Sequence, residues 1–355
     1  MNTMAKFALP ALFVSAIFAS IFACAQQSTV QAAAQHSIKP VAALSPYIDV
    51  HSHMDISDPQ RSVRSALDIM ALANAKKIVF MPSPFTPGDK VMFEAEAFMA
   101  AVKKHPDKMV FLAGGGTLNP MIQEAAVSGA SPEMQRQFRE QAEKLLSEGA
   151  VGFGEISAEH VPSAASPSYM AAPPDGTLFM ILADIAAQHD VIIDLHMEAA
   201  PQDMPLPSDL KSPPNPPTIH GNIAALERLL SHNPRAKIVW AHAGSTDDYG
   251  TRTPELCRRL LAAHTNLYME IKVDPLNLGK NPVIAGDGKI KLEWMKLFQD
   301  FPDRFLIGSD QIYPLARPSE PQRWQAIVLL FNQLPADLRK KIGLDNPTRL
   351  YFGKH

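Results

Sequence analysis

The chain has 355 residues, of which 46 % are hydrophobic and 19 % charged, and its formal net charge is -3. This composition supports a large buried core and excludes a globally disordered chain. The near-neutral charge also argues against nucleic acid or an acidic membrane surface as the main partner, so we expect a small-molecule substrate.

The first 25 residues have the features of an export signal. Lys6 provides a basic start, an apolar run covers residues 7–22, and Ala23-Cys24-Ala25 fits a small-x-small cleavage site. The run is short for a membrane span, which needs about 20 apolar residues. We therefore predict a signal peptide over 1–25 and a periplasmic or secreted mature chain without a membrane span. The alternatives are a retained membrane anchor and a lipoprotein tethered through a lipid on Cys24.

A flexible leader rich in Ala, Gln and Ser is expected over 26–45, and one enzyme domain over 46–355. Cleavage after Ala25 would leave Cys257 as the only cysteine, so no internal disulfide is expected.

From Tyr47 onward, short β-rich runs alternate with helix-like stretches. The runs cover 47–53, 77–83, 109–115, 150–156, 191–197, 237–243, 267–273 and 305–310, and the helical stretches cover 61–75, 90–104, 133–148, 177–189, 221–232, 253–264, 291–300 and 323–333. This alternation predicts a parallel α/β fold, and eight strands are the number that closes a (β/α)8 TIM barrel. The alternative, an open doubly wound sheet, normally has a Gly-rich turn after its first strand, which is absent here.

Two connections after predicted strands are long, at 158–176 and at 199–220, and the second is rich in proline. Loops after strands lie on the catalytic face of a barrel, so both are candidate lids or substrate walls. The alternative is that they are tolerated surface insertions.

Polar side chains stand at the carboxyl ends of the predicted strands. The first strand ends with two histidines, the fifth and sixth with one each, and the fourth and eighth with a carboxylate. In chain order they are His51, His53, Glu155, His196, His242 and Asp310. Because strand side chains alternate between two faces, His51 and His53 are expected to point together into the barrel.

Each of these residues has an ordinary interpretation by itself. A single histidine at a strand end is more often structural, Glu155 could cap a loop, and Asp310 could belong to a turn. Together, at the ends of different strands, they favour a metal centre. Imidazole with carboxylate suits Zn²⁺ best, with Mn²⁺, Fe²⁺ or Co²⁺ as alternatives.

These motifs resemble the amidohydrolase superfamily, most closely its amidohydrolase-related branch (amidohydrolase family 2), over about residues 46–353. The resemblance rests on Asp49-Val50-His51-Ser52-His53, Ile193-Asp194-Leu195-His196, Ala241-His242-Ala243-Gly244, Gly308-Ser309-Asp310 and the closing segment 345–353. It implies a metal-dependent hydrolase on a TIM barrel.

The resemblance also implies a role for each position. His51 and His53 would be the first-strand metal ligands, and His196 the fifth-strand ligand. Asp310 would bind the metal and take a proton from the attacking water. His242 would polarise the substrate or transfer a proton in relatives with one metal, and bind the second ion in relatives with two.

Glu155 departs from the pattern of the closest branch, many of whose members lack a fourth-strand ligand. Gly154-Glu155-Ile156 is instead similar to the Gly-Glu-Ile of TatD-like deoxyribonucleases and some phosphotriesterase-like enzymes, in which this carboxylate bridges two metals. One ion and two ions both remain open, with a slight preference for two.

Two further pairs of strand residues have expected partners. Glu270 and Lys272 share a strand face, so we expect them to pair inside the barrel, with contact to substrate as the alternative. Asp49 and Asp194 lie two residues before His51 and His196, and we expect them beneath the metal as anchors of its ligands.

The function expected from these residues is hydrolysis by water that the ion activates. The attacked group would be the carbonyl of a lactone, ester or amide, or a phosphoester. Non-oxidative decarboxylation is the alternative within the same branch, and a non-catalytic binding protein is the alternative from another class. The sequence leaves the substrate and the oligomeric state open.

Overall fold

The computed structural model describes residues 44–162, 168–208, 210, 215–244, 252–273, 275, 283–316 and 322–353. The expected signal peptide, Cys24 and most of the expected leader lie outside the described residues. Within the described ranges, no helix combines the length and the apolar character that crossing a membrane requires.

Parallel strands form the centre of the fold. In order around it they are β1 (Tyr47–Met54), β2 (Ala75–Phe80), β3 (Met109–Phe111), β4 (Ala113–Gly114), β5 (Gly152–His160), β7 (Ile192–Met197), β10 (Lys237–Ala243), β11 (Leu267–Ile271), β12 (Phe305–Ile307) and β13 (Gln311–Tyr313). They pair in two sheets, of order β13-β1-β2-β3 and β12-β11-β10-β7-β5-β4.

Two interrupted strands join the two sheets into one ring, because one half of each lies in the first sheet and the other half in the second. β3 and β4 are separated only by Leu112, whose N–H donates to the Phe80 carbonyl at 2.8 Å. β12 and β13 are separated by residues 308–310, and the Asp310 N–H donates to the His51 carbonyl at 2.8 Å. Each interrupted strand therefore bridges both sheets. The result is the predicted (β/α)8 TIM barrel.

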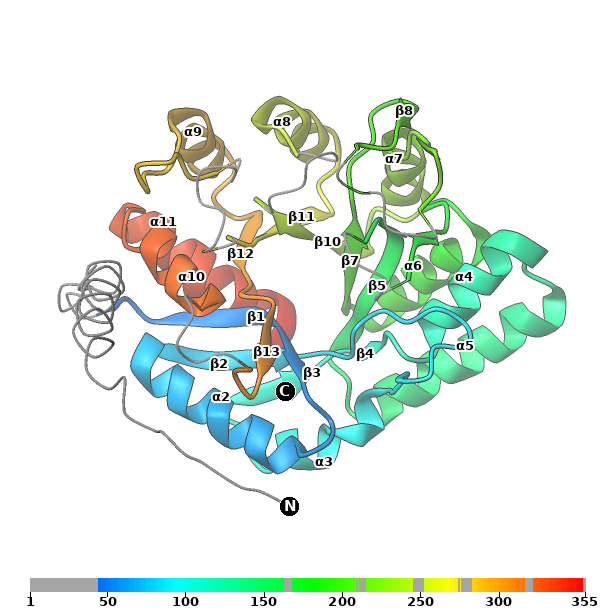
Figure 1. Ribbon diagram of the computed structural model, residues 1–355, viewed down its shortest axis with the longest axis horizontal. Coiled ribbons are helices and arrows are strands. Elements are labelled where there is room, and N and C mark those ends of the chain that lie inside the picture. Colours follow the sequence, from blue (N-terminus) through cyan, green and yellow to red (C-terminus); the bar gives the residue numbers. More distant parts are fainter. Residues whose placement is uncertain are drawn as a thin grey trace, which may run out of the picture. The chain divides into compact units, whose positions relative to one another are not determined.

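Helices cover the outside of the ring (Figure 1). They are α2 (Pro59–Ala73), α3 (Met99–Val102), α4 (Leu118–Ser128), α5 (Pro132–Ser147), α6 (Thr177–His189), α7 (Ile223–His232), α8 (Pro254–Ala263), α9 (Leu292–Asp300), α10 (Arg323–Phe331) and α11 (Ala336–Lys340), with the short turns η1 (Ala95–Ala97), η3 (Lys341–Asp345) and η4 (Thr348–Phe352). In α5, for example, the Ser131 hydroxyl accepts from the Met134 N–H at 3.2 Å, and Pro132 opens the first turn.

One predicted helix was wrong, and one helix was missed. The stretch expected over 90–104 contains only η1 and α3, because the Glu94 carboxylate accepts hydrogen bonds from the Ala95 and Gly114 N–H groups and ties this segment to β4. Helix α4 was not predicted, although it fills the connection after β4 and buries Leu118 and Ile122.

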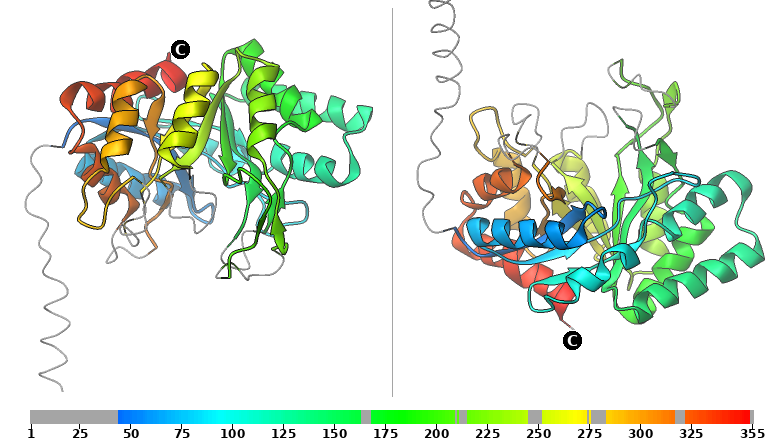
Figure 2. Two further views of the ribbon diagram at one scale, coloured as in Figure 1. Left: turned by 90° about the horizontal axis from the view of Figure 1, so that it is seen from above. Right: turned by 60° about the horizontal axis from the view of Figure 1, so that its bottom comes forward.

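The long connections also contain strands that were not predicted. β5 continues to His160, beyond the expected end at 156, and pairs in antiparallel fashion with β6 (Met170–Ala171). The proline-rich connection holds the hairpin of β8 (Met204–Pro205) and β9 (Thr218–Ile219). Figure 2 shows this hairpin and the end of β5 projecting from the same end of the barrel.

The apolar core has two layers. The larger cluster packs the strands against the helices, with Trp240, Trp294 and Phe153 fully buried in it. The smaller cluster fills the inside of the ring with residues from most of its strands, among them Val50, Val79, Ile192, Val239 and Leu306. Above this inner layer the interior becomes polar.

Candidate metal centre

Local shifts in strand register turn the predicted polar residues inward. Between Asp49 and Ser52, β1 advances three residues while its partner β2 advances two. Val50 packs in the inner apolar cluster, yet the next residue, His51, also faces the interior, where its ring meets Glu155 and Asp194. Similar shifts lie beside Glu155 in β5 and His242 in β10. Such bulges re-aim side chains next to active sites.

Four of the predicted residues converge in what we call the principal group: His51, His53, Glu155 and Asp310. His51 Nε2 and His53 Nε2 are 3.2 Å apart, and Asp310 Oδ1 lies 3.1 Å from His53 Nε2 and 4.0 Å from His51 Nε2. Glu155 Oε2 lies 3.4 Å from His53 Nε2 and 3.7 Å from His51 Nε2. Ligands about 2.0–2.1 Å from a tetrahedral zinc ion are about 3.3 Å from one another, so the spacing of these atoms fits a metal ion.

The outer ring nitrogens of both histidines face oxygen atoms. His53 Nδ1 lies 3.1 Å from the Met81 carbonyl oxygen, and His51 Nδ1 lies 3.5 Å from Asp194 Oδ1. A carbonyl or carboxylate oxygen draws the ring proton to Nδ1 and leaves the Nε2 lone pair facing inward. Two inward lone pairs 3.2 Å apart repel each other unless a metal ion or a shared proton lies between them. The donor set therefore fits a divalent metal.

The second oxygen of Glu155 faces the other two predicted histidines. Oε1 lies 2.6 Å from His196 Nδ1 and 3.1 Å from His242 Nε2. His242 is fixed on its other side by Glu270, whose Oε2 is 3.3 Å from His242 Nδ1 and accepts from the His242 backbone N–H at 2.6 Å. His51, Glu155 and His242 form a second set of potential ligands.

Charge holds both carboxylates of the principal group ionised. Burial opposes ionisation of Glu155, but its contacts with neighbouring imidazoles, above all His196, outweigh it and hold the pKa of this carboxyl well below its usual range. Burial likewise opposes ionisation of Asp310, but Arg323 and Lys272 hold the pKa of Asp310 well below its usual range. Lys272 Nζ lies 2.5 Å and Arg323 Nη1 lies 2.7 Å from Asp310 Oδ2.

The partners expected for Glu270, Lys272 and Asp49 were wrong. Glu270 lies against His242 and Lys272 against Asp310, so each pairs with a site residue rather than with the other. Asp49 does not anchor the His51 ring, because the register shift separates their faces, and it accepts from the Ser309 N–H at 2.9 Å. Asp194 does lie beneath the centre, against His51 rather than His196.

Sequence reasoning missed two residues at the rim of the barrel. His160 Nδ1 lies 3.1 Å from His196 Nε2 and 3.3 Å from Glu198 Oε1, and His196 Nε2 lies 3.2 Å from Glu198 Oε1. We call His160, His196 and Glu198 the rim group. The spacing His196-x-Glu198 was a readable signal, whereas His160 was not, because the extension of β5 beyond residue 156 was not predicted. Burial opposes protonation of His196, but Glu198 and Glu155 raise its pKa to about 10.

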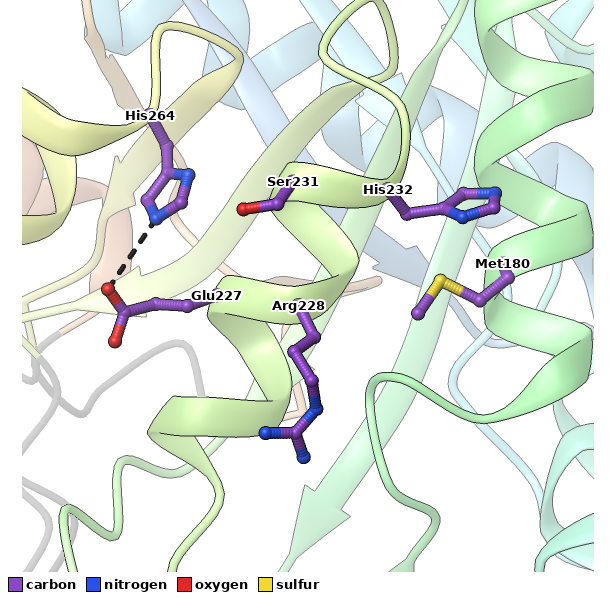
Figure 3. Close-up of a pocket in the computed structure, with 6 residues that line it drawn as sticks. All are labelled: Met180, Glu227, Arg228, Ser231, His232 and His264. Carbon is purple, nitrogen blue, oxygen red and sulfur yellow. Dashed lines mark ion pairs between the residues drawn. The ribbon is translucent and has the colours of Figure 1, made fainter.

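A hollow on the outer surface also contains histidine and glutamate (Figure 3). His264 Nε2 lies 3.6 Å from Glu227 Oε1, and His232 is engaged separately by Asp184 at 3.1 Å. Both histidines lie at the C-terminal ends of helices, where the chain enters the next strand, and therefore at the end of the barrel opposite the catalytic face. This hollow is a useful contrast to the rim group, because its imidazoles do not converge.

Comparison with known proteins gave one family and a set of structures. The family model described as "Amidohydrolase" matches residues 48–353. No curated protein matched the sequence.

Three solved structures illustrate the similarity. A dihydroxybenzoic acid decarboxylase from Polaromonas sp. JS666, with bound manganese and the inhibitor 2-nitroresorcinol, is 16 % identical, covers 87 % of this chain and 97 % of its own, and has a TM-score of 0.48. A 2,6-dihydroxybenzoate decarboxylase complexed with 2,6-dihydroxybenzoate is 12 % identical, with coverage of 87 % and 99 % and a TM-score of 0.46. An amidohydrolase from Mycobacterium avium subsp. paratuberculosis K-10 is 13 % identical, with coverage of 83 % and 76 % and a TM-score of 0.43.

Proposed function

The chain belongs to the amidohydrolase family, and from this premise we propose that it is a metal-dependent hydrolase whose divalent ion is held by the principal group. The observation that carries the proposal is the pair of inward imidazole nitrogens 3.2 Å apart, each with its outer nitrogen facing an oxygen atom. Two histidines and two carboxylates suit Zn²⁺ best, and Mn²⁺ is the alternative.

The residues around the ion have separate tasks in this proposal. A bound divalent ion polarises a carbonyl or phosphoryl oxygen and makes water more acidic. Asp310, kept ionised by Lys272 and Arg323, accepts a proton from the attacking water and returns it to the leaving group. His242, held by Glu270 on one side, presents Nε2 to the centre and donates to the developing negative charge on the substrate.

His196 also determines the position of Glu155. A separation of 2.6 Å between His196 Nδ1 and Glu155 Oε1 suits a charge-assisted hydrogen bond and is shorter than the distance of about 3.3 Å between two ligands of a tetrahedral zinc ion. We therefore propose a single ion in the principal group, with Glu155 oriented by hydrogen bonds. This revises the slight preference for two ions sharing Glu155. It also places His196 outside the ligands of this ion, although the sequence predicted it as one.

Metal content tests this centre directly. The protein is stripped with a chelator, reloaded with Zn²⁺ and analysed by elemental mass spectrometry, beside His53→Ala and His242→Gln. We expect His53→Ala to lose one equivalent and His242→Gln to retain the wild-type content. Loss of an equivalent in both variants would instead support two ions bridged by Glu155. Unchanged content in His53→Ala would remove the proposed centre.

A substrate panel tests the reaction. We expect turnover of a lactone, ester, amide or phosphoester, since these react by attack of water at a polarised carbon or phosphorus. A decarboxylase is the second candidate, and the observation that favours it is the pair of cations, Lys272 and Arg323, that could hold a substrate carboxylate beside Asp310. Release of carbon dioxide from aromatic acids, without hydrolysis of any panel member, would favour that candidate.

Export is also part of the proposal, on the basis of the sequence of residues 1–25. The mass of the protein recovered from cell fractions tests it. Cleavage after Ala25 gives an unmodified soluble product, whereas lipid attachment at Cys24 gives a heavier, membrane-associated one. A full-length chain recovered from the cytoplasm would contradict export.

A further inference from the structure

Arg252 is a buried guanidinium at the carboxyl ends of β7 and β10. The residue is only 3 % exposed. Its Nη1 donates to the His242 carbonyl oxygen at 3.0 Å, and its Nη2 donates to the Met197 carbonyl oxygen at 2.6 Å. The planar fork of one side chain therefore joins the ends of two neighbouring strands. Neither acceptor belongs to the principal group.

The two strands need this link because their own pairing stops short of the site. In the described part of the chain, the register of β7 with β10 ends at Leu195 and Trp240. Beyond this pair, β10 shifts its register against β11 between Trp240 and Ala243, and His242 lies within the shift. The side chain of Arg252 thus continues the connection between the strands where the backbone ladder ends.

Trp240 determines the position of the guanidinium. Arg252 Cζ lies over the Trp240 ring, 4.9 Å from its centroid, and the ring is fully buried. The indole N–H donates at 2.7 Å to the same Met197 carbonyl oxygen that accepts from Arg252. An aromatic face attracts a cation, and a carbonyl oxygen has two lone pairs for two donors. The indole and the guanidinium therefore hold the end of β7 together.

Helix α8 fixes the backbone of Arg252. The next residue, Thr253, caps this helix by accepting from the Leu256 N–H at 3.2 Å, and Pro254 opens its first turn. The side chain of Arg252 therefore begins at a rigid element of the outer layer and reaches inward to the strand ends.

His242 adopts a backbone conformation that depends on such support. Its φ is +65°, in the left-handed region that residues other than glycine seldom adopt. Glu270 Oε2 accepts from the His242 backbone N–H at 2.6 Å, and Arg252 donates to the carbonyl on the other side. A conformation of this kind persists only where the surroundings over-determine it. Two buried charged side chains therefore set the direction in which the His242 ring leaves the strand.

From these contacts we propose that Arg252 is a positioning residue, which holds His242 through its carbonyl oxygen so that Nε2 faces the reacting group. The inference rests on the role of His242 in the proposed function. A misplacement of about 1 Å in a group that acts on the transition state costs about 10²-fold in rate. Loss of Arg252 should therefore lower kcat and leave KM nearly unchanged.

Two substitutions of Arg252 separate positioning from substrate binding. We expect Arg252→Met to keep the metal content of the wild type, to lose about 10–10²-fold in kcat on the best substrate, and to change KM less than about threefold. Arg252→Lys retains the charge and a donor but not the fork, so it should recover part of the loss. A rise in KM at unchanged kcat would mean that Arg252 shapes the substrate pocket, and the inference would be overturned.

Arg304 provides a matched control at the other end of the barrel. Its Nε donates to the Leu267 carbonyl oxygen at 2.8 Å, its Nη2 donates to the His264 carbonyl oxygen, and its Cζ lies 5.3 Å from the Tyr268 ring centroid. The contacts resemble those of Arg252, but Leu267 is the first residue of β11 and lies opposite the catalytic face. Arg304→Met should lower the Tm and keep the wild-type kcat. Equal losses of kcat in both Met variants would reflect a general loosening and contradict positioning.

Nuclear magnetic resonance of the metal-stripped protein, labelled with ¹⁵N-histidine, provides a readout that does not require activity. The ring of His242 faces the fully buried Glu270, with Nδ1 3.3 Å from Oε2, so its N–H should be protected from exchange with water. The absence of its resonance in His242→Gln identifies it. We expect the resonance to shift or to be lost in Arg252→Met and to remain in place in Arg304→Met. An unchanged resonance in folded Arg252→Met would overturn the inference.

This inference and the proposed hydrolase can fail separately. A wild type that binds no ion, or that hydrolyses no member of the substrate panel, would contradict the hydrolase, and the His242 resonance would still decide whether Arg252 holds that residue. Circular dichroism shows whether each variant is folded. If Arg252→Met does not fold, Arg252→Lys provides the comparison: a shifted resonance with a lower kcat supports positioning, and wild-type values of both overturn it.

Discussion

The two oxygens of the Asp310 carboxylate face different surroundings. Oδ1 points toward the His53 imidazole, and Oδ2 is paired with Lys272 and Arg323. The first oxygen can contact an ion, while the second remains in contact with cations that keep the group charged. This division of roles makes Asp310 the most informative residue to substitute.

Replacement of Asp310 by Asn tests proton transfer separately from metal binding. The amide oxygen can still face the centre, but the side chain can no longer accept a proton. We expect a folded protein that keeps most of its metal and loses about 10²–10⁴-fold in kcat on its best substrate. Asp303→Asn, at a carboxylate that is 60 % exposed, is the matched control and should keep its activity. Near-normal turnover in metal-loaded Asp310→Asn would contradict the role of Asp310 in proton transfer.

Glu159 predicts a pH dependence of stability. Burial, together with the nearby Glu198 charge, raises the pKa of Glu159 from its usual value of 4.5 to about 7. Between these two values the folded state binds more protons than the unfolded state. The contribution of Glu159 to stability is therefore complete below pH 4.5 and is lost as the pH rises through 7.

The variant Glu159→Gln should abolish this dependence. The new side-chain amide retains an oxygen acceptor for the Asn222 amide, which donates to Glu159 Oε2 at 2.5 Å. Relative to the wild type, we expect the variant to gain about 1–3 kcal/mol in free energy of unfolding between pH 5 and pH 8. Urea titrations of the metal-stripped proteins measure the difference. A difference that stays constant over this range would show that Glu159 does not titrate between the two states.

At the scale of elements, the order of strands and helices was readable from the sequence, but local register was not. The eight barrel strands were predicted from apolar β-rich runs, and α6 was predicted with its observed bounds, 177–189. The shifts in β1, β5 and β10 depend on how each strand pairs with its neighbour, and the amino-acid pattern of one strand does not contain that information. The rim group was missed for the same reason, since it exists only because β5 and β7 stay paired beyond Glu155.

The break between β12 and β13 makes a prediction of its own. A Cβ added to Gly308 would lie 2.2 Å from Glu270 Oε1 and 2.7 Å from His51 Cβ, both buried. Glu270 cannot move away without releasing the His242 backbone N–H. We expect Gly308→Ala to lower the free energy of unfolding by about 1–3 kcal/mol through overpacking. Urea unfolding measures the change, and a cost below about 0.5 kcal/mol would show that the interior relaxes around the methyl group.

At the scale of the whole molecule, the principal group lies across the seam of the barrel. β1 pairs with β13, and between β12 and β13 the chain is held to β1 by the Asp310 N–H on the His51 carbonyl. The proposed ligands come from β1, from β5 across the ring, and from this interrupted last strand. An ion bound there would cross-link strands that are far apart in sequence, as are Asp49 and Ser309, which are separated by 260 positions.

This cross-link should make the thermal stability of the barrel depend on metal. An ion that binds only the folded state stabilises it by RT ln(1 + [L]/Kd), or about 2.7 kcal/mol at a concentration 100 times the Kd. For a domain of this size, a kcal/mol corresponds to about 2 °C or slightly more, so Zn²⁺ should raise the Tm of the stripped protein by about 5 °C. Differential scanning calorimetry measures the shift, and Glu227→Gln, at the outer hollow, should reproduce it. His53→Ala should lose the shift. If the shift in His53→Ala is as large as in the wild type, the stabilising ion lies elsewhere, and the seam is closed by hydrogen bonds and packing alone.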